Sequence, residues 1–210
     1  CPSLASIITG LYPHQTKITG NEPPIPPDGK RSAEYQRRVQ ECVSFIDTVP
    51  TLPRLLAKRG YVSHQSGKWW QGHYSRGGFT HGMTHGDPKR GGRHGDEGLK
   101  IGRQGMKEIF DFIDDAGEKP FFVWYAPFLP HTPHNPPKRL FDKYAKKTES
   151  KFIARYWAMC EWFDETCGQL LDHLDEKKLA DNTIVLYVTD NGWIQRADNG
   201  RDAPRSKRSQ

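Results

Sequence analysis

Three segments of this 210-residue chain place chemically capable side chains after runs of strand length. Lys68 follows the first run, and its ammonium could hold an oxyanion. His131 lies in a loop that four prolines stiffen, residues 130–137, where a fixed imidazole could act as an acid. Asp190-Asn191-Gly192 supplies a carboxylate and an amide oxygen, donors that Ca²⁺ or Mg²⁺ prefers. Each also has an ordinary interpretation: a solvated lysine, a surface loop and a common turn.

The first ten residues could present a nucleophile. They run from a polar, reactive start at Cys1 through Pro2-Ser3 into small and apolar residues that end at Gly10. Pro2 suits the opening of a helix, because its missing N–H would have no partner within the helix. The free N–H groups of that first turn could face an anion. The segment is therefore either such a platform or a short buried helix with a structural cysteine.

The remaining pattern predicts the elements that must position these groups. Apolar spacing, capping residues and closing glycines predict helices at residues 51–60, 106–113 and 152–174. Strands are expected at 61–66, 120–126 and 183–189, the last two buried on both faces. Alternating helices and strands predict an α/β fold, a largely parallel central sheet flanked by helices. Ligands bind beyond the carboxyl ends of such strands, which is where the three segments lie.

Residues 75–98 form a long segment rich in glycine and histidine. They contain eight glycines and three histidines. Loops of this length are usually functional or disordered, and we interpret this one as a loop near the active site. Its histidines lack the close spacing of metal ligands, so no zinc site is predicted there.

The composition restricts the partners. The net charge of +6 favours either a nucleic acid or a pocket for small anions. The basic residues are scattered, no helix shows a basic stripe and no nucleic-acid-binding motif is present, so we expect no nucleic-acid partner. No apolar run approaches the length of a membrane span. The four cysteines are dispersed and do not define a redox compartment.

In this order, these segments resemble the sulfatases of the alkaline-phosphatase superfamily. The first ten residues are similar to the family's nucleophile signature, Cys-x-Pro-Ser-Arg-Ala-Ser-Leu-Leu-Thr-Gly. The resemblance continues through five further segments: Leu11-Tyr12-Pro13-His14, Thr51 to Trp69, Phe121 to Pro133, Asn182 to Gly192, and Ala203-Pro204-Arg205-Ser206-Lys207. It implies an alkaline-phosphatase-like sandwich, with residues 1–210 forming part of one catalytic domain that is truncated at both ends.

The resemblance also implies a mechanism and a set of site residues. Sulfatases use a formylglycine, made from Cys or Ser by a formylglycine-generating enzyme, to attack the sulfur of a small-molecule or glycan sulfate ester. By matching positions, Lys68 and Lys207 would hold sulfate oxygens and His131 would assist the leaving alcohol. Asp190 and Asn191 would bind a divalent metal, Ca²⁺ or alternatively Mg²⁺. We expect a carbohydrate substrate because the region around Trp69 is aromatic and rich in glycine.

Three departures from the family pattern leave alternatives open. Cys1 falls on the variable position of the signature, so the nucleophile is expected immediately upstream of it. Leu4 replaces the usual Arg, and Trp70 stands where many sulfatases have His. These differences are compatible with a sulfatase whose pocket is reorganised, and with an inactive relative that binds sulfated glycans. A phosphodiesterase or phosphonate hydrolase of the same superfamily is a further alternative.

Overall fold

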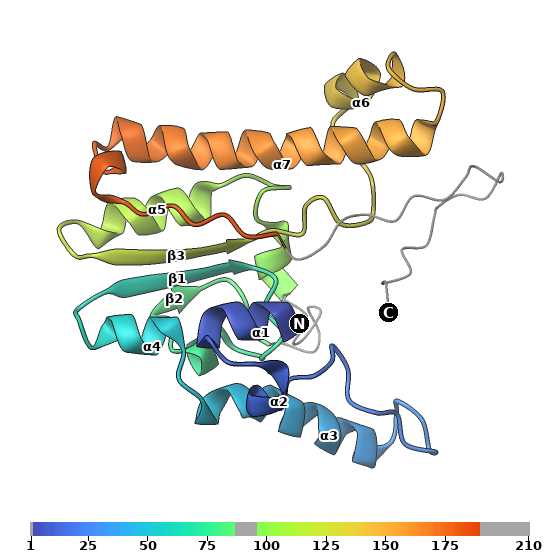
Figure 1. Ribbon diagram of the computed structural model, residues 1–210, viewed down its shortest axis with the longest axis vertical. Helices are drawn as coiled ribbons and strands as arrows, with labels where there is room; N and C mark the ends of the chain where they lie inside the picture. The colour runs from blue at the N-terminus through green and yellow to red at the C-terminus, as the bar shows by residue number, and fades with distance from the viewer. Residues whose placement is uncertain (1, 87–95, 190–210) are drawn as a thin grey trace. The chain divides into compact units, whose positions relative to one another are not determined.

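A computed structural model describes residues 2–86 and 96–189 of the chain (Figure 1). It divides into two units, Cys1–Pro127 and Phe128–Gln210. The first contains a sheet with its flanking helices, and the second contains an 8-residue helix and a 26-residue helix. The fold is therefore mixed α/β, as the sequence predicts.

Three parallel strands form the sheet of the first unit. Their order is β2 (His81–Gly82), β1 (Val62–Gly67), β3 (Phe121–Ala126), which places β1 in the centre. The register pairs Val62 with Phe121 and Gly67 with Ala126, so β1 and β3 end side by side. Five of the six β1 residues are buried, whereas β3 is half-buried throughout. The expectation that β3 is buried on both faces is therefore wrong for the described structure, in which all six residues of the strand keep part of their surface exposed.

Helices cover both faces of this sheet. α5 (Lys107–Ala116) packs Phe112 against His64 of β1, with ring centroids 5.1 Å apart. The opposite face carries a core of Ala5, Ile8, Ile18, Ile46, Trp69 and Phe79, against which Phe122 and Trp124 of β3 pack. Ala5 and Ile8 belong to α1 (Pro2–Thr9), which Gly10 ends with a φ of 69°. Figure 1 shows α5 on one side of the strands and α1 with α4 (Leu52–Ala57) on the other.

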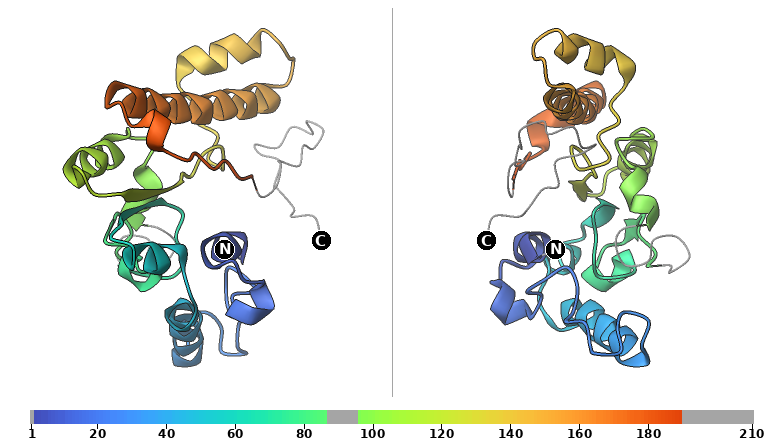
Figure 2. Two further views of the ribbon diagram at one scale, coloured as in Figure 1. Left: turned by 60° about the vertical axis from the view of Figure 1, so that its left-hand side comes forward. Right: turned by 90° about the vertical axis from the view of Figure 1, so that its right-hand side faces the viewer.

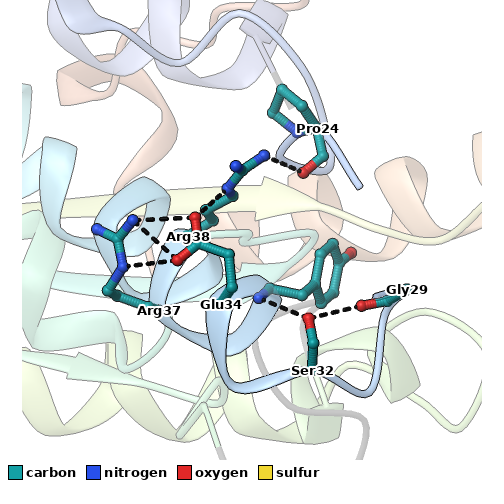
Figure 3. A network of polar contacts seen from close by, with 7 residues as sticks. Pro24, Gly29, Ser32, Glu34, Arg37 and Arg38 are labelled. Atoms are coloured by element: carbon teal, nitrogen blue, oxygen red, sulfur yellow. Dashed lines mark hydrogen bonds and ion pairs between the residues drawn. The ribbon is translucent and has the colours of Figure 1, made fainter. Parts of the chain in front are cut away.

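A polar network fixes the start of α3 (Ala33–Ser44), which follows the short α2 (Pro13–Thr16) and the proline-rich loop (Figure 3). The Ser32 hydroxyl accepts a hydrogen bond from the Tyr35 N–H and donates one to the Gly29 carbonyl. Glu34 pairs with Arg37 and Arg38, and Arg38 also donates to the Pro24 carbonyl at 3.1 Å. The cap satisfies a free N–H of the first turn and ties the loop to the helix. The 3₁₀ turn η1 (Phe45–Thr48) continues from α3.

The second unit is built on a helical hairpin. α6 (Lys138–Ala145) lies alongside the N-terminal part of α7 (Lys151–Glu176), as the views in Figures 1 and 2 show. Ion pairs from Arg139 to Glu165 and from Lys143 to Glu161 join the two helices. Ser150 caps α7 by accepting the Ile153 N–H, and a short turn, η6 (Ala180–Asn182), follows. Of the helices in the described part of the chain, none combines the length and apolarity that a membrane crossing requires.

The strand expected at residues 183–189 does not form. These residues belong to no helix or strand, and five consecutive apolar side chains are 60–88% exposed, Ile184 to Val188. A strand needs a neighbour for its N–H and C=O groups, and among the described residues no strand pairs with this segment. The apolar sequence of residues 183–189 predicted a strand, but it does not indicate whether a neighbouring strand is present to pair with it.

One smaller expectation also needs correction, and one residue at a helix start has an unexpected role. Residues 75–98 are not loop throughout, because they include part of η2 (Tyr74–Gly77), the strand β2 and η5 (Asp96–Lys100). Thr51 occupies the N-cap position of α4 but makes no capping hydrogen bond. Its hydroxyl instead donates to the Gly77 carbonyl at 2.6 Å, which holds the loop after β1 against the start of the helix.

Candidate active site

Lys68 lies at the carboxyl end of β1, the central strand of the described sheet. Its backbone N–H donates to the Ala126 carbonyl at 2.6 Å, and its side chain is half-buried. Gly67 has a φ of 80°, and a Cβ at this position would lie 1.9 Å from the same carbonyl oxygen. Only glycine allows β1 and β3 to approach so closely, and that approach fixes the backbone from which Lys68 projects.

A hydrophobic core connects the Lys68 segment to α1. Trp69, 2% exposed, packs in one cluster with Ala5 and Ile8 of that helix. The Phe79 ring meets the Trp69 indole edge to face, at 88° with centroids 5.4 Å apart. A Cβ at Gly77 would lie 2.6 Å from the indole, so the loop can close over Trp69 only with glycine there. Helix α1, whose sequence is similar to the family's nucleophile signature, therefore shares a hydrophobic core with Trp69, the residue after Lys68.

His131 lies in the second unit, five residues after the end of β3 in the chain. The ring is exposed and stacks on Phe128, with centroids 4.3 Å apart. Its Nδ1 lies 2.9 Å from the Thr132 carbonyl oxygen. A carbonyl oxygen can only accept, so Nδ1 carries the proton in this contact and Nε2 is the nitrogen that can exchange one.

The described parts of the 75–98 segment, residues 75–86 and 96–98, contact the end of β1. A Cβ on Gly98 would lie 2.7 Å from the Gly67 carbonyl oxygen, and the Thr84 N–H donates to the Gln65 side chain at 3.0 Å. The His85 backbone N–H donates to both carboxylate oxygens of Asp96, at 3.1 Å to Oδ1 and 3.0 Å to Oδ2. This contact joins the two described parts of the segment. The composition of the segment indicated a loop near the active site, but not this Asp96 contact, which depends on folding.

A cavity of about 660 Å³ opens between β1, β2, η5 and α5, and Lys68 is not among its lining residues. His64, His81, Glu108, Asp111 and Asp115 contribute to its wall. His64 is 5% exposed, and its Nδ1 has no hydrogen-bond partner among the described residues. Burial, with repulsion from His81 as a smaller cause, lowers the pKa of His64 to about 4. His64 is therefore neutral at physiological pH.

The remaining predicted site residues, Asp190, Asn191 and Lys207, lie outside the described residues, as does Cys1. Lys68 and His131 belong to different units, and the structure fixes each within its own unit. Within residues 2–86 and 96–189, no group of three or more His, Cys, Asp or Glu side chains could hold a metal ion. The carboxylate and amide oxygens of Asp190 and Asn191 nevertheless fit the donor preference of a hard divalent cation.

The fold and the strand end define a class: an α/β protein whose central parallel strand delivers a lysine to the carboxyl edge of the sheet. The profile of the sulfatase family matches residues 1–208, and the chain belongs to that family. This confirms the resemblance seen in the sequence.

Similar proteins agree with this family, and a solved structure agrees with the fold. N-acetylgalactosamine-6-sulfatase from Homo sapiens is 30% identical over 229 residues, covering 91% of this chain and 40% of that protein. The ulvan-active sulfatase of Formosa agariphila is 23% identical and covers 95% of this chain and 42% of that protein. The crystal structure of Ps i-CgsB superimposes with a TM-score of 0.65 at 22% identity, covering 86% of this chain and 45% of that one. The chain thus spans about 40% of the length of these curated relatives.

Proposed function

We propose that the protein hydrolyses a sulfate ester on a carbohydrate. The family supports the reaction class, and the names of two relatives support the substrate class: N-acetylgalactosamine-6-sulfatase and ulvan-active sulfatase. A similar structure, with a TM-score of 0.55, is in complex with its substrate D-glucosamine-2-N,6-O-disulfate.

The observation that carries the proposal is the position of Lys68. A half-buried ammonium at the end of a central strand, joined through Trp69 to α1, suits a sulfate group brought to the start of that helix. Negative charge shifts among the sulfate oxygens as the ester bond breaks, and a fixed cation stabilises that change more strongly than a mobile one in water. Lys207 would supply a second cation to the same group.

In this proposal His131 is the acid that protonates the leaving group. Attack at sulfur breaks the bond between sulfur and the sugar oxygen, and that oxygen must gain a proton to leave as an alcohol. Since the Thr132 carbonyl engages Nδ1, the proton would come from Nε2 of the imidazolium. Stacking on Phe128 restricts the ring to one plane and supports this role.

Asp190 and Asn191 would hold a divalent cation, Ca²⁺ in our proposal, which would supply charge neutralisation at the sulfate oxygens. The nucleophile would be a formylglycine at the position before Cys1, made by a formylglycine-generating enzyme. Mass spectrometry of the peptide that precedes Pro2 tests this directly. An unmodified Cys or Ser there in protein made together with that enzyme would contradict the formylglycine mechanism.

The reaction is tested with matched sulfate and phosphate esters of one sugar alcohol. We expect turnover of the sulfate ester, whereas faster turnover of the phosphate ester would identify a phosphodiesterase-type enzyme instead. A His131→Gln variant should lose about 10²- to 10⁴-fold in kcat on the sugar sulfate but far less on a nitrophenyl sulfate, whose alcohol leaves without a proton. Equal losses on both substrates would exclude His131 as the acid, and His134→Gln is the control from the same loop.

The substitutions at Leu4 and Trp70 keep a second candidate function open. Both residues lie in the segments that flank the proposed site, at positions where the family usually has Arg and His. In this alternative, a site without those two side chains would bind sulfated glycans without cleaving them. Binding of a sulfated sugar with no release of sulfate, by protein whose nucleophile is shown to be modified, would favour this alternative.

A further inference from the structure

Four basic side chains lie close together in the sequence at the turn between α6 and α7. Lys146 and Lys147 lie in the connection, and Lys151 and Arg155 lie on the first two turns of α7. Among the described residues no carboxylate is within ion-pair distance of these four side chains, whereas Lys138, Arg139 and Lys143 on α6 are paired with Asp142, Glu165 and Glu161. We call the four unpaired cations, with Tyr144 and Trp157, the hairpin patch.

Aromatic rings hold three of these cations in place. The Lys147 ammonium lies 5.1 Å from the centre of the Tyr144 ring, Lys151 lies 5.3 Å from that of Phe152, and the Arg155 guanidinium lies 5.9 Å from that of Phe141. Cation–π contacts of this kind order a charged head group without neutralising its charge. Three of the four charges of the hairpin patch are therefore held beside aromatic rings before a ligand arrives.

Trp157 adds a flat apolar surface beside these charges. Its indole is 36% exposed and meets the Tyr144 ring at 6.0 Å, close to the charge of Lys147. Aromatic rings with one apolar face and a nearby charge suit ligands that are partly apolar and partly charged, and a sulfated sugar has C–H faces beside its anionic groups.

The arrangement of charge is costly for the chain by itself. Residues 146–155 carry four cations against one carboxylate, the exposed Glu149. Lys151 and Arg155 are like charges four residues apart on α7, which disfavours a helix. Lys151 is also the first residue of α7, where the helix dipole disfavours a cation and favours an anion. A bound polyanion would relieve both penalties.

The patch is joined to the loop that carries His131. The His134 ring lies 5.6 Å from the ring of Tyr156, which stands between Arg155 and Trp157 on α7. The sequence showed no basic stripe on any one helix, and the structure explains why: the cluster forms only when two helices and their connection fold together.

We propose that the hairpin patch binds the anionic chain of a polymeric sulfated glycan, on sugar units beyond the one whose sulfate is removed. This inference rests on the proposed function for the choice of ligand. The patch would then select polymers over monosaccharides, because only a polymer can occupy the patch while one of its sulfates reaches His131.

The test removes three charges of the patch and leaves Arg155, whose ring contact supports the hairpin. The variant is Lys146→Gln/Lys147→Gln/Lys151→Gln. Its matched control is Lys58→Gln/Arg59→Gln/Lys119→Gln, which removes three exposed charges before β1 and β3, at the other end of the strands from Lys68. Calorimetry measures binding of a polymer rich in N-acetylgalactosamine 6-sulfate and of the monosaccharide itself, at several salt concentrations.

We expect the patch variant to bind the polymer at least tenfold more weakly than the control variant, with a shallower salt dependence and unchanged affinity for the monosaccharide. Equal polymer affinity in the two variants would overturn the inference. So would equal binding of the unsulfated polymer, or equally tight patch-dependent binding of duplex DNA. Lys146→Glu is a second variant with the same expectation should the triple variant not fold.

Because binding is measured without turnover, the inference and the proposed function fail separately. Patch-dependent polymer binding without sulfate release would leave the inference standing and contradict the proposed hydrolysis. Sulfate release at the same KM for the polymer in both variants would contradict the inference alone.

Discussion

Lys68 is the side chain on which the proposed chemistry depends most directly. A Lys68→Ala variant should lose about 10²- to 10³-fold in kcat/KM for a sulfate ester, because one fixed charge at the developing negative charge contributes about 2.7–4 kcal/mol. Release of inorganic sulfate measures the loss. Lys58→Ala, an exposed lysine before β1, is the control. Similar rates in the two variants would mean that Lys68 does not contact the reacting group.

His64 makes the stability of the fold depend on pH. Its pKa is lowered to about 4 by burial and by repulsion from His81, whereas in the unfolded chain it lies near 6.5. Between these values the unfolded state binds a proton that the folded state does not. The stability is therefore complete above about pH 6.5 and is lost as the pH falls towards 4, by roughly 3 kcal/mol in total.

Replacing His64 by Leu tests this dependence. Denaturant titrations between pH 4 and 7 should show a smaller loss of stability with falling pH in His64→Leu than in the parent chain. The charged groups that share its cavity are unchanged in the variant: Glu97, Lys100, Glu108, Asp111, Asp115 and Lys119. His14→Leu removes an exposed histidine and should keep the parent's dependence; identical slopes in all three proteins would rule out His64 as the source.

At the scale of elements, the close approach of β1 and β3 depends on Gly67. Gly67 and Gly60 both have positive φ, 80° and 81°, but a Cβ at Gly60 would have no atom within 4 Å. Gly60→Ala should therefore cost about 1–2 kcal/mol, the penalty of the left-handed backbone alone. Gly67→Ala should cost about 1–3 kcal/mol more, because its Cβ collides with the Ala126 carbonyl. Equal costs in chemical denaturation would show that the two strand ends can separate freely.

Local patterns predicted some elements and missed others for physical reasons. β3 and α7 were predictable, because apolar spacing marks them clearly. α3 was not, since it contains few apolar residues and depends on the Ser32 cap and on the pairs of Glu34. β2 has only two residues, which pair with β1 through a register that no local pattern encodes.

The candidate site divides in a similar way. The position of Lys68 was predictable, because the sequence marks the end of a buried strand just before it. In the structure β1 ends at Gly67, directly before Lys68. The contact of Asp96 with His85 follows from tertiary packing and could not be read from spacing. The same is true of the buried His64 Nδ1, which has no hydrogen-bond partner among the described residues. The roles of Asp190, Asn191 and Lys207 rest on the family pattern and stay predictions.

At the scale of the whole molecule, the chain carries an exposed segment with the properties of an aggregation site. Residues 183–189 contain no charge and no proline, and Ile184, Leu186 and Val188 are 88%, 82% and 62% exposed. The Tyr187 ring lies 6.2 Å from that of Phe163 on α7, so the segment is near the helix without being covered by it. Apolar, uncharged segments of this length pair readily with copies of themselves.

We therefore expect the chain to self-associate with rising concentration through this segment. Leu186→Lys should reduce that association, because stacked copies would bring their added charges together and the lysine removes apolar area. Leu171→Lys is the matched control: it changes a 44% exposed leucine on α7, whose backbone groups are already bonded within the helix. Light scattering over a concentration series measures the difference. If the two substitutions reduce scattering equally, the added charge alone governs solubility, and the exposed segment is not the contact between copies.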